Sequence, residues 1–177
     1  LVVRRLIPEG PPIEVRALQW RVELPIAPRA LLVNKTLASQ GLASTRDFTA
    51  VTVMRATEEI TIDERLEAGD VVVYQANADG VGELWSNPRF GQKEQRLYEV
   101  TLGAEATGNL GEINARDDMD VISARNTTEA LSETPAQAGE LLYVTADSQS
   151  LVENVDGVAM VADVGNRAPQ VLSLIHI

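Results

Sequence analysis

The chain has 177 residues, of which 45% are hydrophobic and 23% charged, so it can build a packed core and general disorder is excluded. It contains no cysteine, and its only histidine is His176, which excludes disulfide scaffolds, thiolate zinc sites and cysteine nucleophiles. Twenty-six acidic and fifteen basic residues give a net charge of -11, which argues against nucleic acid as a partner.

The two ends of the chain predict a slice of a longer protein. The chain begins with Leu1 and ends with Leu172-Ser173-Leu174-Ile175-His176-Ile177. This hexapeptide resembles the in-frame translation of a transposase adapter used to prepare sequencing libraries, and the alternative is a native hydrophobic tail. We therefore interpret residues 172–177 as an adapter artefact and expect the remainder of the truncated chain to be a partner. No apolar run reaches the length of a membrane span.

Period-two alternation predicts β-strands along most of the chain. The first strand runs from Ile13 to Leu24, with a phase slip after Ala17 that indicates a β-bulge, and prolines at 25 and 28 end it. Further strands are predicted at 30–34, 48–55, 71–76, 82–86, 96–102, 119–124, 140–146 and 158–164.

One segment has two interpretations. Thr61-Ile62-Asp63-Glu64 fits a capping box, which predicts a short helix at 62–68. The alternative is a strand through Ile60 and Ile62, because β-branched residues favour sheets.

The breaks between the strands carry turn residues. Asn77-Ala78-Asp79-Gly80 and Asp156-Gly157 each lie between apolar runs, which predicts two hairpins because glycine tolerates the positive φ of a tight turn. Residues 125–139 are polar and contain Pro135, and we expect an exposed loop there.

Two pairs of segments echo one another. Gly69-Asp70-Val71-Val72-Val73-Tyr74 is echoed by Gly139-Glu140-Leu141-Leu142-Tyr143, and residues 97–111 are echoed by residues 151–165. The pattern indicates diverged β units whose spacing is typical of propeller blades.

These echoes carry a resemblance over residues 70–165. Leu97-Tyr98-Glu99-Val100, the run from Gly139 to Thr145, and Val72-Val73-Tyr74 followed by Glu83-Leu84-Trp85 resemble blades of bacterial extracellular and periplasmic β-propeller repeat proteins. The resemblance implies an all-β fold, a partial propeller-like array of antiparallel hairpins, and an extracellular, cell-surface or periplasmic location. A β-sandwich is the alternative fold.

The resemblance divides the chain into regions. Residues 1–68 are expected to form an N-terminal β region or linker, and residues 69–171 the propeller-like region. A few blades cannot close a ring, so the open sheet edges predict oligomerisation or poor solubility.

One cation site is predicted. Asn77, Asp79 and Glu83 supply hard oxygen ligands of the kind that calcium prefers, and a plain hairpin turn is the alternative interpretation. A second acidic cluster, Arg116-Asp117-Asp118-Met119-Asp120, is interpreted as a solvated loop that could also bind a cation. No other cofactor is predicted.

The aromatic residues also have two interpretations. Trp20, Tyr74, Trp85, Tyr98 and Tyr143 could form a sugar-stacking surface, but their places in alternating runs favour core and cross-strand packing.

The sequence therefore predicts a non-enzymatic binding or structural module of a larger secreted or surface β-repeat protein, with a protein or carbohydrate ligand. The alternatives are an adhesin or phage-tail-like β-sandwich and, ranked lowest, a carboxylate-based hydrolase fragment.

Overall fold

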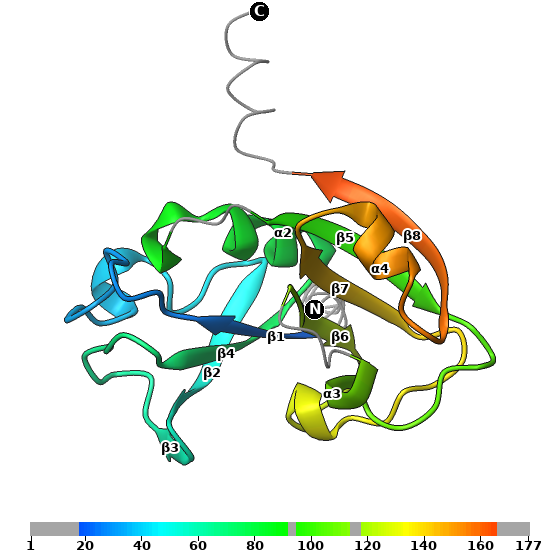
Figure 1. Cartoon of the computed structure of the whole chain (residues 1–177). Helices are drawn as coiled ribbons and strands as arrows, with labels where there is room; N and C mark the ends of the chain where they lie inside the picture. The colour runs from blue at the N-terminus through cyan, green and yellow to red at the C-terminus, as the bar shows by residue number, and fades with distance from the viewer. Residues whose placement is uncertain (1–17, 92–94, 114–117, 166–177) are drawn as a thin grey trace, which may run out of the picture.

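The computed structural model describes residues 18–91, 95–113 and 118–165. In these residues eight strands form one open antiparallel sheet in the order β3-β2-β4-β1-β6-β7-β5-β8 (Figure 1). The fold is mostly β, as predicted. The strands are β1 (Trp20–Pro25), β2 (Phe48–Arg55), β3 (Glu58–Ile60), β4 (Val71–Ala76), β5 (Arg96–Leu102), β6 (Met119–Arg125), β7 (Leu141–Ala146) and β8 (Val158–Gly165).

The helices are short and lie in the connections between strands. They are α2 (Ala78–Ser86), α3 (Leu110–Ile113) and α4 (Gln149–Glu153), with single 3-10 turns at Ala38–Gln40, Pro88–Phe90 and Leu131–Glu133. The helix α2 follows β4, and α4 follows β7 and lies over β7 and β8 (Figure 1).

The strand pairing shows that one structural unit occurs twice in the described sheet. The first unit is β1, β2, β4 and α2, and the second unit is β5, β6, β7 and α4. In each, the last strand lies between the other two, and a helix follows it. The register agrees as well, because Phe48 faces Ala76 in the first unit and Met119 faces Ala146 in the second. Both second strands carry a register shift in the same place, between Ala50 and Thr52 and between Val121 and Ser123.

The turns that lead into β4 and β7 repeat the same hydrogen bonds. Gly69 N–H donates to Ile26 C=O (2.8 Å), and Ile26 N–H donates to Asp70 C=O (2.8 Å). In the second unit Gly139 N–H donates to Leu102 C=O (2.7 Å), and Leu102 N–H donates to Glu140 C=O (2.9 Å). Both glycines have positive φ, 90° and 81°, which explains why the same residue type recurs at this point. The echo of residues 69–74 in residues 139–143 is therefore a repeat of structure.

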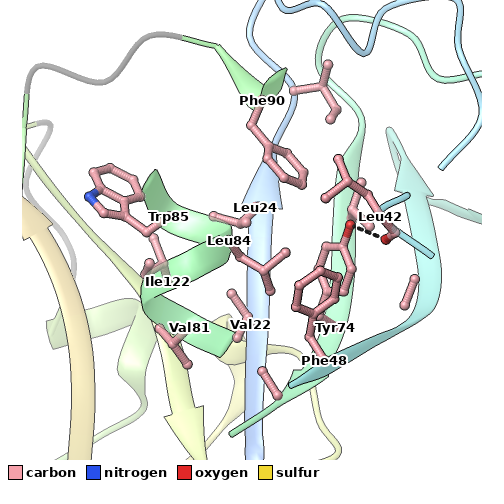
Figure 2. Packing of buried hydrophobic residues seen from close by; sticks show 14 of the residues in the cluster. Val22, Leu24, Leu42, Phe48, Tyr74, Val81, Leu84, Trp85, Phe90 and Ile122 are labelled. Atoms are coloured by element: carbon pink, nitrogen blue, oxygen red, sulfur yellow. Dashed lines mark hydrogen bonds between the residues drawn. The ribbon is translucent and has the colours of Figure 1, made fainter. Parts of the chain in front are cut away.

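Each unit has its own apolar core. Val22, Leu24 and Tyr74 belong to the first core, and Tyr98, Val100 and Val144 hold the corresponding positions in the second. In the first core the helix α2 packs Val81 and Leu84 toward β1 and β4 (Figure 2). Because alternate residues of a strand point to opposite faces, the buried residues of β1 are Trp20, Val22 and Leu24, while Arg21 and Glu23 are half-buried.

Three predictions of secondary structure are wrong. Residues 30–34 form turns and no strand, and residues 82–86 belong to the helix α2. Residues 62–68 form turns and no helix, and of the alternative strand through Ile60 and Ile62 only β3, which ends at Ile60, is present. Asn77 explains the second error, because its side chain accepts a hydrogen bond from Gly80 N–H (2.7 Å) and so starts a helix where a hairpin was expected.

One prediction about a connection is wrong, and a second is correct in part. The expected hairpin at Asp156-Gly157 is a link from α4 to β8, with Gly157 at a φ of 90°. Most of the expected loop at 125–139 is exposed, but Leu131 and Thr134 are buried, because the chain folds back as a 3-10 turn onto the second core. Residues 97–102 and 158–165 pair with each other as β5 and β8, so the weaker echo joins neighbours in the sheet.

The sheet continues across the expected boundary between residues 68 and 69. The strand β4 lies between β2 and β1, so residues on both sides of that boundary share one sheet and one core. The start of the first predicted strand, with the predicted bulge at Ala17 and Leu18, lies partly outside the described residues, as do His176 and the whole of 172–177.

Candidate functional site

The two units meet at a short seam between β1 and β6. Only three residue pairs join these strands, from Trp20 opposite Arg125 to Val22 opposite Ser123. Beyond Val22 the strand β1 stays paired with β4 as far as Pro25, whereas β6 follows β7. The two strands therefore diverge, and the sheet opens between them.

The bulge in β6 shapes the wall of this opening. It falls between Val121 and Ser123, and a bulge bends its strand and redirects the extra side chain. Ile122 is buried in the core of the first unit, while its neighbour Val121 packs against the core of the second. Residues that are adjacent in the chain thus contribute to both cores at the seam.

A cavity of about 400 Å³ lies where the strands diverge. We call it the seam cavity. Its wall is contributed by the strands β1, β4, β6 and β7, by Trp85 of α2, by Gln95 before β5, by α3, and by the 3-10 turn Leu131–Glu133. The lining residues are Glu23, Pro25, Val71, Trp85, Gln95, Leu110, Gly111, Asp120, Val121, Ile122, Leu131, Ser132 and Thr145.

The polar wall of the cavity is rich in hydrogen-bond acceptors. Glu23 Oε2 accepts from Arg21 Nε (2.9 Å) and from Leu131 N–H (2.9 Å), so this carboxylate is fixed across the seam. Asp120 supplies a second carboxylate to the same wall. Carboxylates repel anions and attract cations, and the cavity thus favours a neutral or positively charged ligand.

The apolar wall rests on the placement of α2. Trp85 projects from this helix beside Leu84 and Ile122 (Figure 2). The helix can approach the chain closely at Gly80, where a side chain would collide with the backbone carbonyl of Asp47. The position of the tryptophan thus depends on a glycine one turn earlier in the helix.

The structure places the predicted calcium ligands on α2. Asn77 caps the helix with Oδ1 and donates from Nδ2 to Asp47 Oδ1 (2.9 Å). This bond from Asn77 lowers the pKa of Asp47, against the opposing effect of burial. Asp79 lies in the first helical turn and Glu83 one turn later. In the described part of the chain no group of three His, Cys, Asp or Glu residues is arranged to hold a metal ion, and the calcium site stays a prediction.

The second acidic cluster is only partly described. Asp118 C=O accepts from Gln95 Nε2 (3.2 Å), and Asp120 lines the seam cavity, while residues 116 and 117 lie outside the described ranges. Sequence reasoning missed the cavity itself, since its wall joins residues from 23 to 145 that only the strand order brings together.

The packing interpretation of the aromatic residues is confirmed. Trp20, Tyr74, Trp85, Tyr98 and Tyr143 are all buried, at 6% exposure or less. Trp20 of β1 and Tyr143 of β7 meet edge to face across the seam, with ring centroids 4.7 Å apart. The contact between Trp20 and Tyr143 therefore joins the two units, while Tyr74 and Tyr98 pack within the first and second cores and Trp85 lines the seam cavity.

No family model, curated protein or solved structure matches the chain. None of the described helices is long and apolar enough to cross a membrane.

Proposed function

We propose that the protein is a non-enzymatic binding or structural module of a larger, repeat-built secreted or surface protein, and that it binds its ligand in the seam cavity. The position of the cavity carries the proposal, because it lies at the joint of two repeated units and both contribute to its wall. In repeat proteins the stacking of like units creates the shared surfaces that are used for binding.

The chemistry of the cavity favours a peptide ligand with basic residues. The exposed carboxylate of Asp120 suits a Lys or Arg side chain, and the adjoining Leu110 and Val121 suit an apolar one. A sugar ligand would need an aromatic face for stacking, and of the five aromatic rings named above only Trp85, at 6% exposure, lines the cavity. We therefore place a protein partner ahead of a carbohydrate.

The repeat supports one part of the propeller resemblance and weakens another. Two copies of one unit agree with a repeat-built protein. Propeller blades are separate four-stranded sheets around a channel, and sandwiches are two face-packed sheets, whereas the described strands form one sheet. Repeated units that share one sheet are therefore the arrangement we favour, with a propeller or an adhesin-like sandwich as alternatives.

The hydrolase alternative ranks lowest. A glycosidase needs one carboxyl group that holds a proton for the leaving group. Glu23 Oε2 already accepts hydrogen bonds from Arg21 Nε and from Leu131 N–H, so the protein itself holds this carboxyl group in the wall.

A nuclear magnetic resonance titration of the full chain tests the proposal. The probes are short peptides containing Lys and Arg, acidic peptides of the same length, and a neutral disaccharide. We expect the basic peptides alone to shift the amide signals of Gln95, Ser132 and Thr145, because these residues line the seam cavity.

Two variants separate the cavity from the rest of the surface. Ser132→Trp fills the cavity from an exposed residue of the 3-10 turn Leu131–Glu133 and should abolish the shifts. The matched control, Ser39→Trp, makes the same change in the exposed 3-10 turn Ala38–Gln40 and should leave them intact. Equal shifts with acidic peptides, or shifts that survive Ser132→Trp, would contradict the proposal. Hydrolysis of chromogenic glycosides that is lost in Asp120→Asn would put the hydrolase first.

A further inference from the structure

The two edges of the described sheet differ in how they are protected. At one edge β3 is three residues long and exposes Glu58 and Glu59. The neighbouring start of β2 is covered by a loop, since Ala50 N–H donates to Ala43 C=O (2.7 Å) and Thr45 N–H donates to Phe48 C=O (2.7 Å). Short strands, charges and covering loops are the ordinary means of preventing edge-to-edge pairing.

Within the described residues the opposite edge, β8, lacks those protections, and its register with β5 shifts only near its two ends. It is eight residues long, and its residues from Val158 to Gly165 include one charge and no proline or lysine. Its register with β5 is regular from Met160 opposite Thr101 to Asp163 opposite Tyr98. An edge strand of this kind turns every second backbone N–H and C=O outward, where another strand can pair with them.

The side chains of β8 also favour pairing. Ala159, Met160 and Ala162 are exposed, and Met160 is 69% exposed, which makes it one of the most exposed large apolar residues of the described chain. The single charge, Asp163, forms an ion pair with Arg96 of β5 (Oδ2 to Nη2, 2.9 Å). The edge therefore presents small apolar side chains and a carboxylate that already has a cationic partner.

The repeat shows that the sheet can continue at this place. In the first unit, the side of β1 that faces away from β4 pairs with β6, and β7 is the next strand beyond β6. In the second unit the corresponding strand is β5, and its side facing away from β7 pairs with β8. The position beyond β8 thus corresponds to the one that β7 fills beyond β6, where an antiparallel strand is part of the same sheet.

We propose that β8 is an assembly edge, at which a second copy of the chain adds its own β8 in antiparallel pairing and extends the sheet to sixteen strands across a two-fold axis. The sequence of β8 fits such self-pairing. A register centred on Val161 places Met160 of each copy opposite Ala162 of the other, so a large side chain meets a small one. Each copy carries a net charge of -11, and this repulsion opposes the pairing, so added salt strengthens it.

Sedimentation of the full chain over a wide concentration range tests the proposal. We expect the average mass to double as concentration rises, with the transition at lower concentration in high salt. Met160→Lys should keep the chain monomeric, because a lysine on the edge is a common block to strand addition. Leu31→Lys is the matched control, since Leu31 is 66% exposed and lies outside the sheet, and this variant should still dimerise.

Hydrogen exchange distinguishes strand pairing from other contacts. In the dimer the outward amides of residues 159–163 should exchange more slowly than in the monomer, and in Met160→Lys this slowing should be lost while the remaining amides keep their protection. A chain that stays monomeric at every concentration and salt, a dimer that survives Met160→Lys, or a dimer whose protected amides lie elsewhere would overturn the proposal.

Discussion

The two units place different groups at the same structural position. Asp70 and Glu140 both follow a glycine of positive φ, and the backbone carbonyl of each accepts a hydrogen bond from a backbone N–H at the end of the first strand of its unit, Ile26 or Leu102. Asp70 receives two bonds from Arg55 (2.9 Å each) and one from Glu67 N–H (2.8 Å). Counted along the equivalent registers, the position of Arg55 is held by Asn126 in the second unit.

The pKa values of the two carboxyl groups move in opposite directions. Burial acts to raise the pKa of Asp70, but the hydrogen bonds from Arg55 and Glu67 outweigh it, and the pKa is lowered. Burial also raises the pKa of Glu140, and there the distant charge of Arg125 offsets only part of the effect. The first unit thus holds a buried carboxylate that is paired with an arginine, whereas the cost of burying the carboxylate of Glu140 in the second unit is offset only in part. The two units differ at the end of their second strands, where one has Arg55 and the other Asn126.

Removal of Arg55 should give the largest loss of stability. Arg55→Ala leaves the carboxylate of Asp70 buried without its cation, and we expect a loss of about 3 kcal/mol. This value is the lower end of the range for breaking a buried ion pair, and we choose it because the arginine side chain is 29% exposed. Urea unfolding monitored by tryptophan fluorescence measures the loss. Arg46→Ala is the control, since Arg46 is 90% exposed and 3.9 Å from Asp47, and it should change stability by less than about 0.5 kcal/mol. Equal effects of the two variants would refute a special role for the Arg55–Asp70 pair.

Substitution of the two turn glycines should cost less stability than removal of Arg55, and the two losses should match. Gly69→Ala and Gly139→Ala each force a side chain into the left-handed region, at a cost of about 1–2 kcal/mol. Space is open at both sites, since a Cβ there would meet nothing within 4 Å, so backbone conformation alone sets the cost. Thermal and urea unfolding measure the two losses.

A third glycine provides the contrast. Gly157→Ala combines a φ of 90° with a Cβ only 2.7 Å from Ala106 Cα, and it should cost more than either turn variant. If the losses for Gly69→Ala and Gly139→Ala differ by as much as either differs from Gly157→Ala, the two turns are not equivalent.

The sequence predicted the strands of both units better than their connections. Alternation gave 48–55, 71–76 and 96–102 with the bounds that β2, β4 and β5 have, because these strands each pack against a core. The helix α2 was missed because Asn-Ala-Asp-Gly is also a turn sequence. The spacing of Val81, Leu84 and Trp85, three and four residues apart, was the helical signal that could have identified it.

The seam cavity was beyond sequence reasoning for a different reason. Its two carboxylates, Glu23 and Asp120, lie almost a hundred residues apart, and they share a wall only because β6, which pairs with β7 on one side, pairs with β1 on the other. The repeat of residues 69–74 was visible as a weak echo, since a glycine of positive φ and an apolar strand leave a mark in the sequence. The partner of Asp70 was not visible, because nothing local links Arg55 to it.

Substitution of Glu140 should have the smallest effect, and its sign depends on pH. Because burial raises its folded pKa above the ordinary value of 4.5, Glu140 favours the folded state only while it is protonated, and this contribution is lost as pH rises through the folded pKa. Glu140→Gln should therefore stabilise the chain by up to about 0.5 kcal/mol at neutral pH and give no gain at pH values where the glutamate is protonated.

Asp70→Asn should destabilise the chain at neutral pH, and this loss should shrink in acid. The reason is that the pKa of Asp70 is lowered in the folded state, so its carboxylate stabilises the fold above its unfolded pKa, and this contribution is lost as pH falls through the folded pKa. Urea midpoints of both variants at neutral and acidic pH check the pair of signs. A loss of stability in Glu140→Gln at neutral pH would mean that Arg125 compensates the glutamate as fully as Arg55 compensates Asp70, and the contrast between the two units would fail.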